Sequence, residues 1–251
     1  MNPKTPLSHT RFVETYAASR YKIKLPHWLA AWECWPNWES ERFSSMEALL
    51  KKGDVLFDIG TESASCSVIY AQFVGPENMC LFEGLPDWWP NIKATWEANE
   101  LVAPKSALCT LVSDKTIIPS GVDFTLGNRG PWPEPSYDQN LLDAYRCRYI
   151  WEHANRTPQI TVDDFVNQTG IIPTAFTIDV EGAEGNVLQG AHETLQKYHP
   201  KIWASLHPEL ETRWKEWNFT FDIRYVHSLL NEIGYKGQHL ATDHEEHWLF
   251  T

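Results

Sequence analysis

The amino-acid sequence predicts an open α/β fold, in which a mostly parallel sheet carries helices on both faces. Three observations lead to this fold class. Short apolar runs alternate with longer amphipathic stretches from residue 53 to the end of the chain, except at residues 115–157. Most apolar runs end at a glycine or a carboxylate, as strands do when they lead into ligand-binding loops. No internal repeat or low-complexity tract interrupts the pattern, so the 251 residues fit one large domain with an N-terminal arm.

The composition argues against several classes of function. The net charge is −12 and no run of Lys or Arg occurs, so nucleic acid, which binds mainly through clustered cations, is not an expected partner. No apolar window approaches the roughly 18 residues of a membrane span, and MNPKTPLSHTR lacks the apolar core of a signal peptide. The five cysteines are scattered without a CxxC pair, which fits a reducing compartment and disfavours a cysteine zinc site. We therefore expect a cytoplasmic protein without a membrane span.

Residues 1–52 are expected to form a helical, aromatic-rich arm ahead of the main domain at 53–251. The stretch HWLAAWECWPNW contains four tryptophans. SSMEALLKKG predicts a short helix that Ser44 or Ser45 caps and Gly53 stops. Such an arm would serve as a homodimer contact or as a lid over a ligand site.

The main domain begins with the alternation that defines the fold. Strands are expected at 54–60 (DVLFDIG), 79–83 (MCLFE), 106–114 (SALCTLVSD), 175–179 (AFTID), 201–207 (KIWASLH), 235–241 (YKGQHLA) and 245–251 (EEHWLFT). Helices are expected at 64–75, 86–101, 161–170, 183–199 and 221–234. This arrangement predicts a sheet of seven strands.

The segment 115–157 breaks the alternation. It contains GNRGPWPEPSYDQ, which is dense in Gly and Pro and shows little periodicity. Because loops at strand ends carry specificity, we expect this insertion to bind a substrate, with Trp132 and Tyr137 stacking on a sugar face.

Polar residues follow the first three expected strands. Asp58, Gly60, Thr61 and Glu62 lie at the end of the first strand, Glu83 ends the second and Asp114 ends the third. In an open α/β sheet, ligands bind beyond the carboxyl ends of the strands, and an acid at the end of the second strand accepts hydrogen bonds from a ribose diol. The alternative for Glu83 is a helix cap ahead of Pro86. The loop DIGTESAS has one glycine and lacks G-x-G-x-x-G, so a ligand without a diphosphate, such as S-adenosylmethionine, fits better than a nicotinamide dinucleotide.

The order of four motifs resembles the FkbM family of S-adenosylmethionine-dependent methyltransferases. These motifs are DIGTESAS, LFEGLPDWWPNIKATWEAN, TVDDF and TIDVEGAEGNVLQGA, which together cover roughly residues 54–210. The resemblance implies a Rossmann-like class I methyltransferase fold, with an antiparallel strand at the end of the sheet. It also implies an enzyme that is usually an O-methyltransferase of sugars, glycans or natural-product hydroxyls.

The resemblance assigns roles to individual residues. Asp58 and Gly60 match the cofactor loop, Glu83 the ribose-binding acid and Asp114 the position near the adenine, while Asp179 and Glu181 match the acidic strand end beside the reacting methyl group. There are three departures from the family pattern. Ala64 replaces a glycine, Glu62 replaces a small or amide residue, and Gly84 replaces a common proline. The Glu62 carboxylate either bonds the methionine ammonium or faces solvent.

Acids and a histidine at the fourth and fifth strand ends suggest how an acceptor hydroxyl would lose its proton. Asp179 and Glu181 follow the fourth strand, and His207 and Glu209 follow the fifth. One hypothesis makes His207 a general base oriented by Asp179. The other places a divalent ion such as Mg²⁺, Mn²⁺ or Fe²⁺ on Asp179, His207 and Glu209.

Two neighbouring groups have structural explanations. Glu184 is expected in the first turn of a helix, where a carboxylate complements the helix dipole, and Glu181 fits that role as well as a catalytic one. His244 and His247, in DHEEH, resemble a metal-binding pair by composition only.

The sequence thus predicts an S-adenosylmethionine-dependent O-methyltransferase that acts on a hydroxyl of a small molecule, sugar or glycan. A non-catalytic scaffold with a methyltransferase-like fold is the alternative, supported by Ala64 and Glu62. An enzyme of nucleotide sugars or nicotinamide is a third hypothesis, which the missing glycines weaken.

Overall fold

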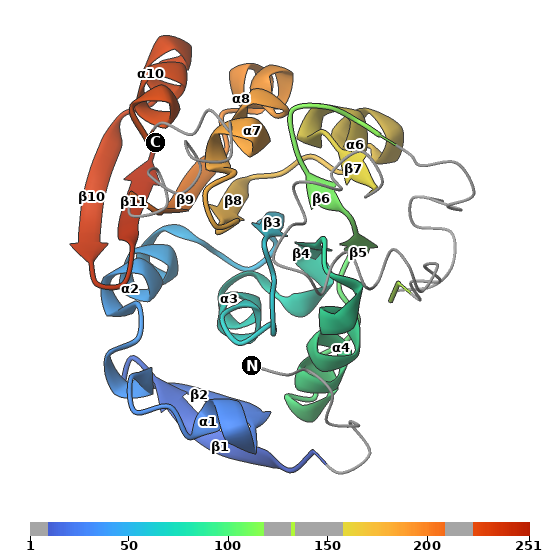
Figure 1. Ribbon diagram of the computed structural model, residues 1–251, viewed down its shortest axis with the longest axis vertical. Coiled ribbons are helices and arrows are strands. Elements are labelled where there is room, and N and C mark those ends of the chain that lie inside the picture. Colours follow the sequence, from blue (N-terminus) through green and yellow to red (C-terminus); the bar gives the residue numbers. More distant parts are fainter. Residues whose placement is uncertain (1–9, 118–131, 134–157, 209–222) are drawn as a thin grey trace.

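The computed structural model describes residues 10–117, 132–133, 158–208 and 223–251, which form a seven-stranded sheet between layers of helices (Figure 1). The strands are β3 (Leu56–Ile59), β4 (Met79–Glu83), β5 (Ser106–Cys109), β8 (Ala175–Ile178), β9 (Lys201–Leu206), β10 (Gly237–Thr242) and β11 (Glu246–Phe250). Six of them fall within a stretch that the sequence predicts as a strand, and β10 extends one residue beyond its predicted stretch at 235–241. Because β3, β4 and β8 are buried on both faces inside the sheet, they are nearly continuous apolar runs.

The strand order is β10-β11-β9-β8-β3-β4-β5. β5, β4, β3, β8 and β9 pair in parallel, whereas β11 is antiparallel to both of its neighbours. The chain starts at the centre with β3, moves outward to β5 and returns to β8 on the other side. The order therefore reverses between β3 and β8, where the carboxyl ends of the strands offer a ligand site. The α/β fold class and the antiparallel final strand are confirmed.

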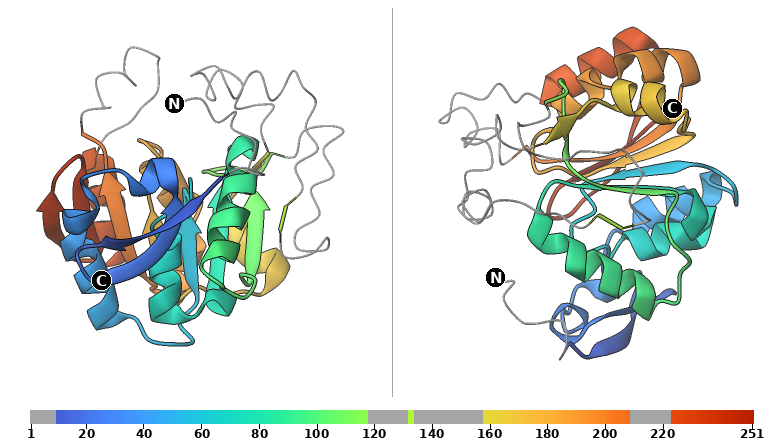
Figure 2. Two further views of the ribbon diagram at one scale, coloured as in Figure 1. Left: turned by 90° about the horizontal axis from the view of Figure 1, so that it is seen from below. Right: turned by 90° about the vertical axis from the view of Figure 1, so that its right-hand side faces the viewer.

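Helices cover both faces of the sheet (Figures 1 and 2). One face carries α6 (Val162–Thr169), α7 (Glu184–Gln189), α8 (His192–Tyr198) and α10 (Ile223–Ile233). The other face carries α2 (Ser40–Leu49), α3 (Ser67–Val74) and α4 (Trp89–Ala98). Each layer encloses its own apolar core. Among the helices of the described ranges, none is long and apolar enough to cross a membrane.

The N-terminal segment differs from the predicted helical arm. Residues 12–26 form a hairpin of β1 (Phe12–Ala17) and β2 (Tyr21–Pro26), followed by the short helices α1 (His27–Ala30) and η2 (Trp35–Asn37). The sequence YKIKLP alternates with period two, so Tyr21, Ile23 and Leu25 pack into the core below α3 and α4. The prediction of helices was therefore wrong for the hairpin, although α2 is helical as expected.

Three element boundaries also differ from the predictions. Helix α2 begins at Ser40 rather than at Ser44 or Ser45, with Glu39 in a left-handed conformation before it. The third strand ends at Cys109, and the chain then turns into β6 (Leu111–Val112), which pairs with β7 (Gln159–Ile160). The long helix expected at 183–199 is two helices, since Gly190 interrupts it where the Ser113 carbonyl packs closely against the backbone.

Candidate active site

The loop after β3 is built around Asp58. The Ser67 hydroxyl donates a 2.5 Å hydrogen bond to Asp58 Oδ2, and the Thr61 hydroxyl donates to the Asp58 carbonyl oxygen at 3.2 Å. Burial raises the pKa of Asp58 to about 6, although these hydrogen bonds and the charge of Arg42 oppose the rise. Asp58 is therefore a buried residue that stabilises the loop through its hydrogen bonds with Ser67 and Thr61.

Gly60 has a close neighbour in the next strand of the sheet. Its φ is +91°, and a Cβ at this position would lie 1.7 Å from the Asp179 carbonyl oxygen. The backbone N–H of Asp179 also donates to the Ile59 carbonyl at 2.9 Å. The predicted cofactor loop and the predicted reaction acid are therefore in direct contact.

Glu83 is buried at the end of β4, next to the same loop. Its Oε2 accepts the backbone N–H of Glu62 at 2.9 Å and its Oε1 accepts that of Leu85 at 2.7 Å. Burial raises its pKa to about 7, despite these two hydrogen bonds. Each carboxylate oxygen keeps a second lone pair for a further donor.

Glu62 and Ala64, the two residues of this loop that depart from the family pattern, both have a positive φ. Glu62 has a φ of +50° and Ala64 a φ of +62°, in the left-handed region that favours glycine. Ala64 is fully buried, whereas the Glu62 side chain is exposed. The loop therefore has the shape that glycines would provide, with a carboxylate at its surface.

Asp114 does not join this group. It lies on the surface after β6, where its Oδ1 accepts a hydrogen bond from the Ser113 hydroxyl and lies 3.5 Å from Asn186 Nδ2 of α7. The residue beside the end of β4 is Leu111, whose side chain would clash with a Cβ on Gly84. The early end of β5 explains this difference, because the chain has left the sheet five residues before Asp114.

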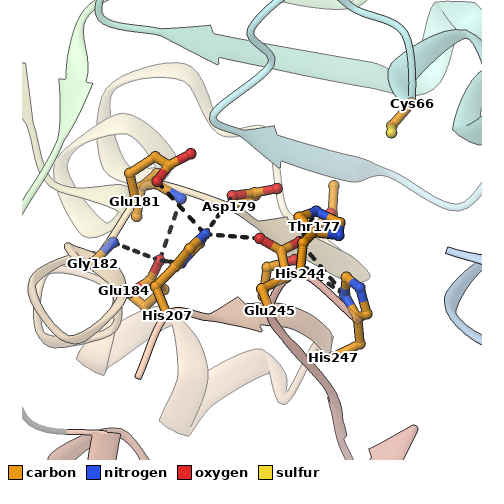
Figure 3. Close-up of polar contacts among 12 residues, drawn as sticks. Cys66, Thr177, Asp179, Glu181, Gly182, Glu184, His207, His244, Glu245 and His247 are labelled. Carbon is orange, nitrogen blue, oxygen red and sulfur yellow. Dashed lines mark hydrogen bonds and ion pairs between the residues drawn. The ribbon is translucent and has the colours of Figure 1, made fainter. Parts of the chain in front are cut away.

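His207 is the centre of the other half of the site, at the end of β9 (Figure 3). Its Nδ1 lies 3.1 Å from Oε1 of the fully buried Glu184, which also accepts the backbone N–H of Gly182 at 3.0 Å. Its Nε2 lies 3.6 Å from Asp179 Oδ1 and 3.8 Å from Glu181 Oε2. The structure thus brings together all three residues that the sequence predicts to be catalytic.

Glu245 also belongs to this cluster, and sequence analysis missed it. Its Oε2 lies 2.8 Å from His207 Nε2, and its side chain is 3% exposed. Because β11 runs antiparallel to β9, the turn before β11 returns to the edge where β9 ends. Burial would lower the pKa of His207, but its hydrogen bonds to Glu184 and Glu245 raise it to about 11, so this histidine is a cation at neutral pH.

Asp179 is the carboxylate of this cluster that combines access to solvent with a raised pKa. Its side chain is 34% exposed, against 3% for Glu245. Partial burial is the main cause that raises the pKa of Asp179, and repulsion from Glu245 adds to it. The positive charges of His207 and Arg42 act in the opposite direction. Glu181 lies further out, with a side chain that is 77% exposed.

Arg42 is a second residue that sequence analysis missed. It extends from α2 into the sheet, where Nη1 donates to Ser205 Oγ at 2.7 Å and to Glu39 Oε2 at 3.1 Å, and Nη2 donates to the Thr177 hydroxyl. The side chain is 2% exposed. Two polar residues in otherwise apolar strands were the available signal, since Thr177 and Ser205 both need a buried partner.

The remaining predicted residues are less central. Trp132 packs edge-on against Trp96, with ring centroids 6.1 Å apart, while Tyr137 and Glu209 lie outside the described residues. His244 stacks on Trp38, and both His244 and the buried His247 contact Asp243. The predicted metal set of Asp179, His207 and Glu209 thus has two described members, and Glu245 completes a three-residue cluster with them.

Comparisons with known proteins relate the chain to methyltransferases. Residues 124–236, a little under half of the chain, match the model of the methyltransferase FkbM domain. This range includes TVDDF and TIDVEGAEGNVLQGA and excludes DIGTESAS and LFEGLPDWW. No curated protein matches the chain.

Several solved structures are similar at low sequence identity. The methyltransferase FkbM of Methylobacillus flagellatus is 14% identical with a TM-score of 0.48, over 81% of this chain and 45% of that one. The precorrin-6y C5,15-methyltransferase of Geobacter metallireducens is 13% identical with a TM-score of 0.42, over 84% of this chain and 86% of that one. M. jannaschii TYW2, solved in complex with AdoMet, is 10% identical with a TM-score of 0.43, over 98% of this chain and 87% of that one.

The chain thus spans less than half the length of the first of these structures. The fold rests on the strand order and the antiparallel β11, and the similarity to the FkbM domain on the matched segment with its motifs. Residues 124–236 of the chain are therefore similar to the FkbM methyltransferase domain, in agreement with the resemblance that the motifs in the sequence carry.

Proposed function

We propose that the protein is an S-adenosylmethionine-dependent O-methyltransferase that methylates a hydroxyl of a sugar or glycan. The observation that carries this proposal is the geometry of Glu83. Two backbone N–H groups fix its carboxylate at the strand end next to Gly60, and the free lone pairs suit the two hydroxyls of a ribose. A carboxylate needed only as a helix cap would not need donors from two different loops.

The arrangement around Asp179 supports transfer to an oxygen. Methyl transfer is an in-line displacement, so most of the catalysis comes from alignment of the oxygen, the methyl carbon and the sulfur. The contact between Gly60 and Asp179 places an acid directly beside the loop proposed to hold the donor. The exposed part of the Asp179 carboxylate is available to an acceptor hydroxyl, and its raised pKa suits a general base.

In the proposed reaction, proton removal and methyl transfer take place together. The Asp179 carboxylate takes the proton of the acceptor hydroxyl while that oxygen forms a bond to the methyl carbon. The carbon–sulfur bond breaks, and its electron pair stays on sulfur to give S-adenosylhomocysteine. His207 donates both N–H groups to Glu184 and Glu245, so it offsets negative charge and positions the cluster, rather than serving as the base.

A non-catalytic scaffold is the alternative, and one observation favours it. Glu62 and Ala64 occupy left-handed positions that cost less with glycine, so the loop is not optimised for close approach of a ligand. Calorimetry with S-adenosylhomocysteine separates the two proposals. The enzyme proposal expects binding by the wild type and at least tenfold weaker binding by Glu83→Gln, with Glu97→Gln, a surface carboxylate of α4, as the matched control.

Activity is tested with a labelled methyl donor and a panel of sugar and glycan acceptors. Asp179→Asn is expected to lose about 10²- to 10⁴-fold in kcat, as removal of a general base does, while it retains S-adenosylhomocysteine binding. No binding of S-adenosylhomocysteine by the wild type would favour the scaffold instead.

A further inference from the structure

Three side chains that commonly bind metals meet at the end of β9. Asp179, His207 and Glu245 each direct one ligand atom to a region in which these atoms lie within 4.8 Å of one another. His207 Nε2 lies 2.8 Å from Glu245 Oε2 and 3.6 Å from Asp179 Oδ1. Ligands that are about 2.1 Å from a first-row ion lie roughly 3.0–3.5 Å from each other, so both separations are close to the edges of a coordination shell.

The other nitrogen of His207 has the partner that a metal-binding imidazole needs. Glu184 is fully buried and accepts from Nδ1 at 3.1 Å. A carboxylate in this position fixes the tautomer, so that Nε2 directs its lone pair toward the metal. Without an ion, only a proton on Nε2 allows the 2.8 Å contact with the Glu245 carboxylate.

The cluster also contains more acidic groups than basic ones, which favours a bound cation. Four carboxylates surround one imidazole, from Asp179, Glu181, Glu184 and Glu245. The guanidinium of Arg42 is bound to Glu39, Thr177 and Ser205 instead.

One oxygen of the Glu245 carboxylate lacks a hydrogen-bond partner among the described residues. Its Oε1 is buried and has no hydrogen-bond partner within the described part of the chain, with the nearest imidazole nitrogens at 3.4 Å in His244 and 3.7 Å in His247. Buried carboxylate oxygens normally have a donor or a metal ion. The carboxylate that carries this unsatisfied oxygen also contributes its Oε2 to the group around His207.

We propose that Asp179, His207 and Glu245 bind one divalent transition-metal cation such as Mn²⁺. A set of two carboxylates and one imidazole suits Mn²⁺, Fe²⁺ or Zn²⁺ better than an all-oxygen ion such as Ca²⁺. The ion takes the place of the Nε2 proton, so one proton leaves for each ion bound. With the ion bound, Asp179 is a ligand rather than a free base, and the ion would instead lower the pKa of the acceptor hydroxyl; this role rests on the proposed function, whereas the binding does not.

Two neighbouring groups compete as metal ligands. Asp243, His244 and His247 form one, and Glu39, His244 and Glu245 form the other. The first lies mainly on the surface of the β10–β11 turn, and the second includes Glu39, which is already paired with Arg42 at 3.1 Å. The set around His207 is favoured because the buried Glu184 carboxylate holds the far nitrogen of its histidine, and the ion takes the place of the Nε2 proton between His207 and Glu245.

The test is a titration of the metal-free chain with Mn²⁺, followed by electron paramagnetic resonance and calorimetry at pH 8. The wild type is expected to bind one ion, with release of about one proton, which appears as an enthalpy that depends on the buffer. Glu245→Gln is expected to weaken binding at least tenfold, and Glu184→Gln about 10- to 100-fold by loss of the oriented imidazole. Glu246→Gln, the adjacent carboxylate, and Asp243→Asn are expected to bind as the wild type does.

Circular dichroism and thermal unfolding show whether each variant is folded. Absence of Mn²⁺ binding by the folded wild type, or unchanged binding by folded Glu245→Gln, overturns the proposal. Loss of binding in Asp243→Asn instead assigns the ion to the surface group and also overturns it. S-adenosylhomocysteine binding is measured in EDTA, so a failure of the proposed function is seen separately from a failure of the metal site.

Discussion

The carbonyl oxygen of Asp179 lies in the space that a Cβ on Gly60 would occupy. A Cβ there would be 1.7 Å from the oxygen, and the φ of +91° is itself unfavourable for any other residue. This contact joins the end of β3 to the end of β8, which are the two central strands of the sheet. The geometry of the proposed site therefore depends on the absence of one side chain.

Gly60→Ala is expected to destabilise the protein by about 2–4 kcal/mol, from backbone strain and from overpacking against Asp179. Urea unfolding measures the change. Gly170→Ala is the matched control, because Gly170 also has a positive φ, of +69°, but nothing lies within 4 Å of the added Cβ. Equal losses in the two variants would show that the contact with Asp179 has no energetic role.

Glu62→Gly is expected to stabilise the protein by about 0.5–1 kcal/mol. The left-handed conformation costs a non-glycine residue about 1–2 kcal/mol, and the greater freedom of glycine in the unfolded chain returns part of that. Glu62→Gln keeps the backbone strain and removes the charge, so its stability should stay close to that of the wild type. A weaker affinity of Glu62→Gln for S-adenosylhomocysteine would show that the carboxylate contacts the ligand.

Arg42→Met is expected to cost about 3–5 kcal/mol, because it leaves the buried Glu39 carboxylate without its counter-ion. Arg20→Met removes an arginine whose pair with Glu47 is half exposed, and it should cost less than about 1 kcal/mol. Thermal and urea unfolding of both variants give the comparison. Similar small losses would mean that Arg42 contributes packing and little electrostatic stabilisation.

The His207–Glu245 pair is expected to make stability depend on pH at both extremes. The pKa of His207 is raised from 6.5 to about 11, so its contribution is complete below pH 6.5 and is lost as the pH rises through about 11. The pKa of Glu245 is lowered from 4.5 to about 2, so its contribution is complete above pH 4.5 and is lost as the pH falls through about 2. Both contributions are therefore complete between pH 4.5 and 6.5.

Glu245→Gln should lose about 1.5–3 kcal/mol in that range, as expected for a hydrogen bond to a charged group, and should show a flatter pH dependence. Unfolding in EDTA across the pH range measures this, and Glu246→Gln is the control. The carbon chemical shifts of the His207 ring report its charge directly. A neutral His207 at pH 8 in the metal-free protein would contradict the assignment.

Much of the sheet and half of the site follow from local patterns in the sequence. An apolar run that ends in a carboxylate, as DVLFDIG, MCLFE and AFTID do, predicts both a strand and the position of its acid at the sheet edge. Asp58, Glu83 and Asp179 were found in this way. Asp114 was not, because Thr110 ends the third strand early and the run of apolar residues continues in β6.

The other half depends on contacts between distant segments. Arg42 reaches Thr177 across 135 positions of the chain, and Glu245 reaches His207 only because the final strand is antiparallel. The N-terminal hairpin was not predicted, although the period-two alternation in YKIKLP is a local strand signal. The contacts of Arg42 with Thr177 and of Glu245 with His207 form only in the packed fold, so no short stretch of sequence contains them.

Binding of S-adenosylhomocysteine to the wild type and to Glu83→Gln, measured by calorimetry from pH 5.5 to 9, tests the central claim most directly. The pKa of Glu83 is raised to about 7, so the ionised carboxylate that accepts ribose hydroxyls is lost as the pH falls through that value. The account predicts that wild-type affinity is constant above about pH 8 and falls progressively below pH 7. It predicts that folded Glu83→Gln binds at least tenfold more weakly at pH 8 and shows no such transition. Wild-type protein that fails to bind at any pH, or a Glu83→Gln variant that binds as the wild type does, would contradict it.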